Sequence, residues 1–383
     1  MGDNVRLRHF GDCARLVRDT CNPTDVPPLT PYIGLEHIPE NDLHLSDYGF
    51  AGDVASTKTK FKKEDILFGK LRPYFRKVII APFDGVCSTD IWVVRAKKEV
   101  DQKYLFYWMA SHEFVDQATQ GSEGTKMPRA KWEYISRFEQ PVPSLPEQHF
   151  IAEVLGALDD KIELNRRMNA TLESMARAVF KAWFVDSEEA KGWKVGILEE
   201  LADLNPEAWS NKSAPSQVEY IDLSNTKWGT IEETIIYSWK DAPSRARRIL
   251  RPGDTILGTV RPGNGSYALI TRKGLTGSTG FAVLRPKSVA YREYVYLATT
   301  SKENIEWFAH LADGAAYPAI RPEIVISSEI ARPPDEILEK FSTIAKPLMD
   351  KIASNDEQSR TLAALRDALL PRLMRGEVRI APS

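Results

Sequence analysis

Few side chains of this sequence are spaced as catalytic or metal-binding groups are. The six histidines include no HxH or HExxH, and the three cysteines include no CxxC, so no zinc-ligand spacing is present. No GxGxxG or GxxxxGK(S/T) loop offers a nucleotide site. Asp84, followed by Asp101 and Lys103, resembles a metal-dependent nuclease pattern, but two acids and a lysine arise easily at this distance. We therefore expect no catalytic residues, no metal site and no cofactor.

Two clusters of basic side chains are chemically more distinctive. Residues 58–77 hold eight Lys and Arg against two acids, and residues 240–273 also hold eight against two, while the whole chain has a net charge of −2. Such clusters bind phosphates, and a few Arg, Lys, Asn or Gln side chains among them can read base edges. One cluster alone would favour a charged, solvated sheet edge that resists aggregation. Two clusters at equivalent positions of the sequence favour binding to nucleic acid over a solvated sheet edge.

The clusters are at equivalent places because the chain repeats itself. Asp65–Pro73 reappears as Asp254–Pro262, and the loop Gly124–Arg129 has its counterpart at Gly314–Tyr317. The spacing between matching residues stays between 188 and 190 along the chain, which indicates a tandem duplication of about half of it.

We predict that these repeated elements contact DNA. Positive and polar side chains in each cluster are expected to bind phosphates or bases, and the two loops are expected to add further contacts. The predicted DNA-binding residues are Lys58, Lys60, Arg72, Arg76, Lys77, Thr125, Lys126 and Arg129 in the first copy, and Arg245, Arg247, Arg248, Arg261, Asn264, Tyr267 and Tyr317 in the second.

Each copy has the pattern of an α+β domain followed by a long helix. Short β-rich runs such as Ile91–Val94 are separated by Pro and Gly turns, and a helical segment, Gln102–Gln117, lies between them. Ser144 and Glu147 have the spacing of a capping box at the start of the first long helix. The predicted segments are a first domain at 1–145, a helix with its linker at 146–192, a second domain at 193–332 and a second helix at 333–383.

Both predicted helices carry apolar residues every seven positions, interrupted by one asparagine. In coiled coils such an asparagine fixes partner and register at some cost in stability. We therefore expect an antiparallel pair in which Asn165 and Asn355 lie close together, with a kink or interruption at Pro347. The alternative is that each helix packs only on its own domain. The seam of the first helix contains Ile151, Leu158, Asn165, Leu172 and Val179, with Val154, Met168, Met175 and Ala182 as companions, and that of the second contains Phe341, Leu348, Asn355, Leu362 and Leu369.

Length and composition place the chain among ordinary globular proteins. Its 383 residues exceed what one compact core usually spans, so two or more domains are expected. Hydrophobic residues make up 43% and charged residues 27%, which argues against disorder. The sequence has no apolar run long enough to span a bilayer, and its unpaired cysteines suit a reducing compartment. We expect a cytoplasmic protein without membrane contact.

Several motifs resemble those of Type I restriction–modification specificity subunits, and together they cover nearly the whole chain. Two of them, at the ends of the predicted helices, are specific to that family. The motifs are Leu145–Gln148, Phe180–Phe184, Gly192-Trp193, Asp65–Pro73 and Leu369–Glu377.

The resemblance implies two α+β target recognition domains in tandem repeat, separated by two long antiparallel coiled-coil helices. Each domain would read one half of a bipartite site in double-stranded DNA. Two modification (methyltransferase) subunits would dock on the helices, and restriction (motor–nuclease) subunits would join the complex. Methyl-donor, ATP and metal chemistry would belong to those partners, which leaves this subunit non-catalytic. The expected partner-binding residues are Phe180, Trp183, Phe184, Leu373 and Met374.

Two other interpretations compete with this one. A self-contained, duplicated DNA-binding regulator without methyltransferase partners would also explain the basic clusters, although it would not need such long helices. A nuclease or a methyltransferase would need the catalytic pattern that the sequence does not present.

Overall fold

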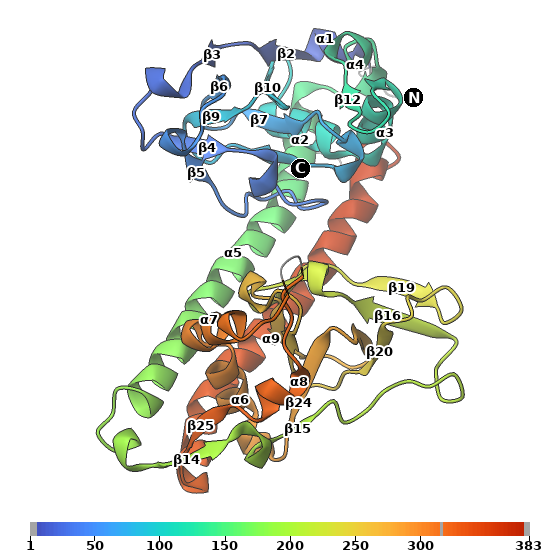
Figure 1. Cartoon of the computed structure of the whole chain (residues 1–383). Coiled ribbons are helices and arrows are strands. Elements are labelled where there is room, and N and C mark those ends of the chain that lie inside the picture. Colours follow the sequence, from blue (N-terminus) through green and yellow to red (C-terminus); the bar gives the residue numbers. More distant parts are fainter. Residues whose placement is uncertain (1–5, 315–316, 379–383) are drawn as a thin grey trace. The chain divides into compact units, whose positions relative to one another are not determined.

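The computed structural model describes residues 6–314 and 317–378, which fold into two compact units (Figure 1). Unit 1 contains the chain up to Arg166 and again from Glu357, and unit 2 contains Arg167–Asp356. Each unit combines an α+β domain with a segment of each of two 40-residue helices, α5 (Leu145–Phe184) and α9 (Asp335–Met374). The α+β class expected from the sequence is therefore confirmed.

The domain of unit 1 is built on two sheets. One is a four-stranded antiparallel sheet in the order β2-β10-β7-β8, and the other is a five-stranded mixed sheet in the order β3-β6-β9-β4-β5, in which β4 and β9 are parallel. The first sheet comprises Ala14–Val17, Ile91–Ala96, Ile66–Gly69 and Val78–Ile80, and the second comprises Thr20–Cys21, Lys58–Phe61, Gly85–Ser88, Pro31–Ile33 and Gly49–Phe50.

Among the described residues, the domain of unit 2 repeats this topology except at one sheet edge, where no strand takes the place of β3. Its antiparallel sheet has the order β15-β24-β21-β22, and its mixed sheet has the order β19-β16-β23-β20, in which β16 and β23 are parallel. The internal repeat predicted from the sequence is thus a repeat of architecture. The strands of the two sheets are Ala202–Leu204, Phe281–Pro286, Thr255–Gly258 and Tyr267–Leu269, then Ile235–Ser238, Gln217–Ile221, Leu275–Ser278 and Ala246–Ile249.

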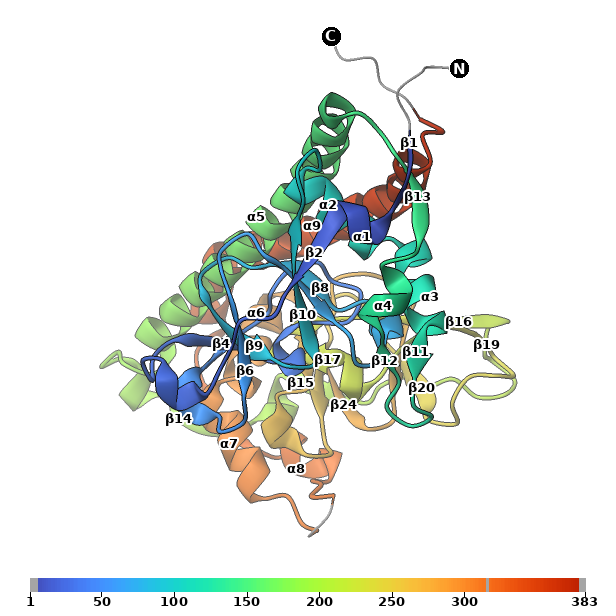
Figure 2. The same cartoon turned by 90° about the horizontal axis from the view of Figure 1, so that it is seen from above.

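Two short helices follow the antiparallel sheet in each domain. In unit 1 the segment expected to be one helix is two, α2 (Gln102–Ala110) and α3 (His112–Gln120), because the Ser111 side chain caps α3 by accepting from the Phe114 amide. In unit 2 the counterparts are α6 (Arg292–Thr299) and α7 (Lys302–His310). In unit 1, α1 (Phe10–Cys13), α3 and α4 (Trp132–Ile135) gather at the opposite end of the domain from the five-stranded sheet (Figures 1 and 2).

Shorter elements complete both domains. They are β1 (Arg6–His9) paired with β13 (Glu139–Val142), β11 (Ser122–Glu123) with β12 (Arg129–Ala130), β14 (Lys194–Ile197) with β25 (Glu329–Arg332), β17 (Thr226–Lys227) with β18 (Thr230–Ile231), and helix α8 (Pro322–Ile326).

The two long helices run antiparallel within each unit. The Glu147 half of the predicted capping box is present at the start of α5, where the Ser144 amide donates to the Glu147 carboxylate at 3.0 Å. The Ser144 hydroxyl donates to the same carboxylate at 2.8 Å. In α9 the helix continues through Pro347, so the interruption expected there is wrong.

Both seam asparagines are buried and contact the opposite helix. In unit 1 the Asn165 amide donates to Gln358 at 2.9 Å and to Ser359 at 3.2 Å. In unit 2 the Asn355 amide donates to Asn169 at 2.8 Å. Ser359 and Asn169 each lie four residues after the other helix's seam asparagine, so the two contacts are equivalent in the repeat. The closeness of the two asparagines to each other stays a prediction.

The apolar seam is only partly where the heptads place it. Ile151 and Phe341 are buried as expected, but the companion positions Met175 and Ala182 are exposed. Leu155 and Ala176 are buried instead. The buried face of α5 is therefore rotated about the helix axis relative to the companion positions that the heptads predict.

A buried polar triad ties the helices of unit 1 to its domain. Arg366 pairs with Asp159 at 2.7 Å, and Asp159 also accepts from the Tyr107 hydroxyl at 2.7 Å. Burial, together with the nearby Asp159 carboxylate, raises the pKa of Tyr107. The equivalent positions of unit 2 are filled by buried apolar residues, namely Ala176, Met349 and Leu297.

This difference gives a prediction for the stability of unit 1. Arg366→Ala should cost about 3–5 kcal/mol, since it leaves the Asp159 carboxylate buried without its cation. Installing all three apolar residues of unit 2, as Tyr107→Leu, Asp159→Met and Arg366→Ala together, should return stability to the wild-type level or above. Denaturant unfolding of the full chain measures both. A triple variant as unstable as the single variant would contradict the account.

Candidate nucleic-acid interface

Each domain presents one arginine from a strained turn at the end of a central strand. Arg72 follows β7 and Arg261 follows β21, and both have left-handed backbone conformations with φ of 51° and 48°. A 3-10 turn comes next in each copy, Pro73–Phe75 and Pro262–Asn264. We call residues 72–76 and 261–265 the Arg–Pro turns. A residue with a Cβ costs about 1–2 kcal/mol in this conformation, so other contacts must hold it.

A glycine- and proline-containing loop supplies those contacts in both copies. The Arg72 amide donates to the carbonyl of Pro128 at 2.7 Å, and the Arg261 amide donates to that of Pro318 at 2.7 Å. We call these the Gly–Pro loops, since each begins at a glycine with positive φ, Gly124 at 103° and Gly314 at 111°. Turn and loop therefore form one site that is built twice.

The guanidinium groups of the two turns lie against aromatic rings. The guanidinium carbon of Arg261 lies 4.8 Å from the ring centre of Tyr317, which is 72% exposed. That of Arg72 lies 6.0 Å from the Phe75 ring, and its Nη2 donates to the Lys126 carbonyl at 3.4 Å. Among the residues that the structure describes, the buried Nε of Arg72 has no hydrogen-bond partner. Both sites thus offer a positioned cation at the protein surface.

An ion pair anchors the loop of unit 1 further. Arg129 donates from Nε and Nη2 to the two carboxylate oxygens of Asp90 at 2.9 and 3.0 Å. These hydrogen bonds hold the pKa of Asp90 below its usual value. Unit 2 has Gly280 and Ala319 at the equivalent places. Arg129, predicted to bind DNA, is thus already paired, and Asp90 is a positioning residue that no sequence pattern indicated.

Several predicted residues surround the Arg–Pro turns and are accessible. Thr125 and Lys126 are exposed in the loop of unit 1, and Asn264 is exposed in the turn of unit 2. Lys60 is half-buried on β6, and Lys77 is half-buried with its Nζ donating to the Leu35 carbonyl at 2.8 Å.

The side chains of three predicted DNA contacts are buried, so the structure does not present them at the surface. Arg76 is 2% exposed and donates to the Ala110 carbonyl at 2.6 Å and to Asp367 at 3.2 Å, so it joins the domain to α9 within unit 1. Lys58 donates to the carbonyl and hydroxyl of Ser56, and burial lowers its pKa. Tyr267 is 5% exposed in the core of unit 2.

The arginines of β20 and of the loop before it form a second group in unit 2. Arg245 is paired with Asp222, and the Arg247 guanidinium lies 4.5 Å from the Trp239 ring centre. Arg248 is half-buried, and this burial lowers its pKa. The basic cluster of residues 240–273 is therefore divided between the Arg–Pro turn and these three arginines, which already make contacts within unit 2.

The residues expected to bind partners mainly form the cores of the two units. Phe184 is buried and packs on Phe341 in unit 2, while Leu373 and Met374 are buried in the core of unit 1. Their own domains cover these three side chains, so the structure does not present them to a partner. The other two, Phe180 and Trp183, are half-buried against the core of unit 2.

Comparisons with known proteins agree with the duplicated site. Residues 26–174 match the model of the Type I restriction modification DNA specificity domain. This segment belongs to that family. The Type I restriction enzyme MjaIX specificity subunit of Methanocaldococcus jannaschii is 25% identical over 335 residues, which cover 80% of this chain and 72% of that protein. The EcoDI specificity subunit of Escherichia coli is 34% identical over 187 residues, which cover 46% of this chain and 41% of that protein.

The fold of the chain is also found among solved structures. The S subunit of a Type I restriction–modification system from M. genitalium is 14% identical, with a TM-score of 0.59 and coverage of 100% of this chain and 98% of that one. The matched segment and the two relatives confirm the resemblance to Type I specificity subunits, and the solved structure supports the fold.

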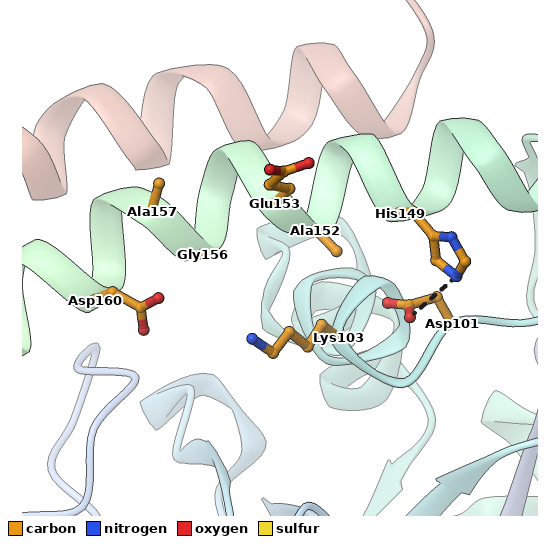
Figure 3. A pocket seen from close by; sticks show the side chains of 8 residues that line it. All are labelled: Asp101, Lys103, His149, Ala152, Glu153, Gly156, Ala157 and Asp160. Atoms are coloured by element: carbon orange, nitrogen blue, oxygen red, sulfur yellow. Dashed lines mark ion pairs between the residues drawn. The ribbon is translucent and has the colours of Figure 1, made fainter. Parts of the chain in front are cut away.

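The acids of the nuclease-like pattern do not assemble around the pocket of unit 1 that Figure 3 shows. Its lining includes Asp101, Lys103, His149 and Asp160, and its volume is about 290 Å³. Asp101 caps α2 and lies 3.6 Å from His149, whereas Asp84 accepts from the Lys63 amide elsewhere.

Within 6–314 and 317–378, no group of three or more His, Cys, Asp and Glu could hold a metal ion. No helix of the described chain is long and apolar enough to cross a membrane.

The strain at the Gly–Pro loop gives a second prediction. Gly124→Ala should cost about 1–2 kcal/mol locally, because a Cβ is strained at φ 103° and would lie 3.2 Å from the Met127 carbonyl. The hydrogen bond from the Arg72 amide should open more often, so its hydrogen exchange should quicken roughly 5- to 30-fold. Gly192→Ala is the control, since no atom lies within 4 Å of a Cβ there. If the Arg72 amide exchanges at the same rate in both variants, the Gly–Pro loop does not hold the Arg–Pro turn as described.

Proposed function

We propose that this chain is the DNA sequence-recognition subunit of a Type I restriction–modification complex, and that each unit reads one half of a bipartite site. The observation that carries the proposal is the Arg–Pro turn held by a Gly–Pro loop, present once in each unit with the same backbone hydrogen bond. Arginine is the side chain best suited to bidentate contacts with guanine in the major groove, and it also binds phosphates.

Differences between the two sites support two different half-sites. The turn of unit 1 contains Phe75, where that of unit 2 has the exposed amide of Asn264. Tyr317 lies under the arginine of unit 2, whereas Met127 stands at the equivalent loop position of unit 1. A shared backbone with different side chains would orient two readers in the same way while each selects other bases.

Catalysis belongs to the partners in this proposal. The modification subunits would transfer methyl groups, and restriction subunits would supply motor and nuclease activity with their own cofactors. The self-contained regulator is the second candidate, and it differs by needing no partner surface on the helices.

The exposed apolar residues of the helices favour partners. Met175 of α5 is 50% exposed and Leu365 of α9 is 46% exposed, and they occupy equivalent positions of the repeat. A monomeric chain gains nothing by exposing large apolar side chains, whereas a partner can cover them. Two equivalent positions suit two copies of one modification subunit, each docked in the same way.

DNA selection tests the recognition role. We expect Arg72→Ala in the assembled complex to relax one half of the selected site and Arg261→Ala to relax the other, each at a cost of about 1–3 kcal/mol per lost base contact. The measurement is selection from a randomised duplex pool, followed by affinity for the selected sequence. Lys98→Ala, on the exposed loop after β10, is the control. An unchanged site in both arginine variants would refute the assignment.

Stoichiometry tests the docking role. Met175→Asp and Leu365→Asp should each reduce the number of bound modification subunits from two to one, and the double variant should bind none, because a carboxylate would be buried at the contact. Native mass spectrometry of the co-purified complex counts the subunits. If the double variant keeps both partners, docking lies elsewhere.

A further inference from the structure

A tryptophan next to the Arg–Pro turn of unit 2 lies largely in solvent. Trp228 forms the two-residue loop between β17 and β18 together with Gly229, and it is 54% exposed. Its backbone φ is 46° and that of Gly229 is 90°, as in the tight hairpin turn that favours Asn-Gly. A bulky residue with positive φ is a strained choice, and such strain is often found at functional sites.

The hairpin holds this tryptophan in one place. The Trp228 amide donates to the Gly265 carbonyl at 2.7 Å, and the Gly229 amide donates to that of Tyr267 at 2.9 Å. A Cβ on Gly265 would come within 2.5 Å of the indole, so the ring packs directly on the last residue of the Arg–Pro turn. The ring also lies 6.0 Å from that of Tyr267, and its remaining surface is presented to solvent. Part of the indole is thus held by packing on the turn, and the rest is accessible from solvent.

A left-handed residue also lies beside the Arg–Pro turn of unit 1, but in an irregular segment and not in a hairpin. Asn41 has φ of 57°, and its amide donates to the Phe75 carbonyl of the turn at 3.2 Å. It is exposed, as Trp228 is. Next to the turn, unit 1 therefore presents a small amide and unit 2 a large aromatic ring. Asparagine accepts this backbone more readily than tryptophan, so packing or turn geometry alone does not explain the tryptophan.

We propose that Trp228 is a specificity-determining residue that stacks on a base of the second half-site. The proposal rests on the proposed function, since it requires that unit 2 binds DNA through its Arg–Pro turn. Aromatic side chains stack on bases or wedge between base steps, and pyrimidine–purine steps open most easily. Arg261 of the same Arg–Pro turn, which lies over Tyr317, would hold the backbone or a neighbouring base. Unit 1 reads its half-site without such a wedge.

The decisive variant is Trp228→Asn, which installs the residue type of unit 1. It relieves the backbone strain, so the melting temperature should stay the same or rise. Affinity for the selected site should nevertheless fall roughly 5- to 150-fold, with relaxed preference at one or two adjacent positions of one half-site. Trp228→Phe should retain most of the affinity. Val289→Ala, which truncates another exposed apolar residue of unit 2, is the control and should change nothing.

Selection uses the complete complex and a randomised duplex pool, and a second pool that contains 5-iodouracil tests the stacking by photocross-linking. A cross-link to the peptide with Trp228, together with half-site relaxation, supports the proposal. An unchanged site in Trp228→Asn overturns it, and so does a lower melting temperature with uniformly weaker binding, which would make the residue structural. If the wild-type complex selects no sequence at all, the proposed function itself fails.

Discussion

The left-handed backbone of one arginine in each unit is the constraint on which the proposed recognition surface depends. Arg72 and Arg261 adopt this conformation only because a proline carbonyl of the Gly–Pro loop accepts their amide hydrogen bond. The loop in turn requires a glycine with positive φ. Strain at the arginine is thus offset by an interaction between segments more than 50 residues apart in the sequence, and the result is a guanidinium group held in a fixed direction.

The duplication lets two units share this constraint while they differ in chemistry. The order of the antiparallel sheet and the turn–loop hydrogen bonds are the same in both, whereas the residues around them change from Asp90 and Arg129 to Gly280 and Ala319. Their interiors also diverge, since a buried Tyr-Asp-Arg triad in unit 1 corresponds to three apolar residues in unit 2. Backbone geometry is therefore what the repeat preserves, and side chains determine what each unit can bind.

Local patterns in the sequence predicted much of this fold. The duplicated segments, the strand at Ile91–Val94 and the Glu147 half of the capping box depend on neighbouring residues, and the structure confirms them. Burial was harder to predict because it depends on distant partners. Arg76 looked like a DNA contact in a basic cluster, but its partner Asp367 lies 291 residues away. The heptads likewise identified long helices but not which companion residues face inward, so Met175 was placed in the seam although it is exposed.

A structure of the assembled complex on its selected duplex is the most direct test of the central claim. The account predicts guanidinium nitrogens of both Arg72 and Arg261 within about 3 Å of base or phosphate acceptors, one in each half-site. DNA bound to another face, with both guanidinium groups left in solvent, would contradict it.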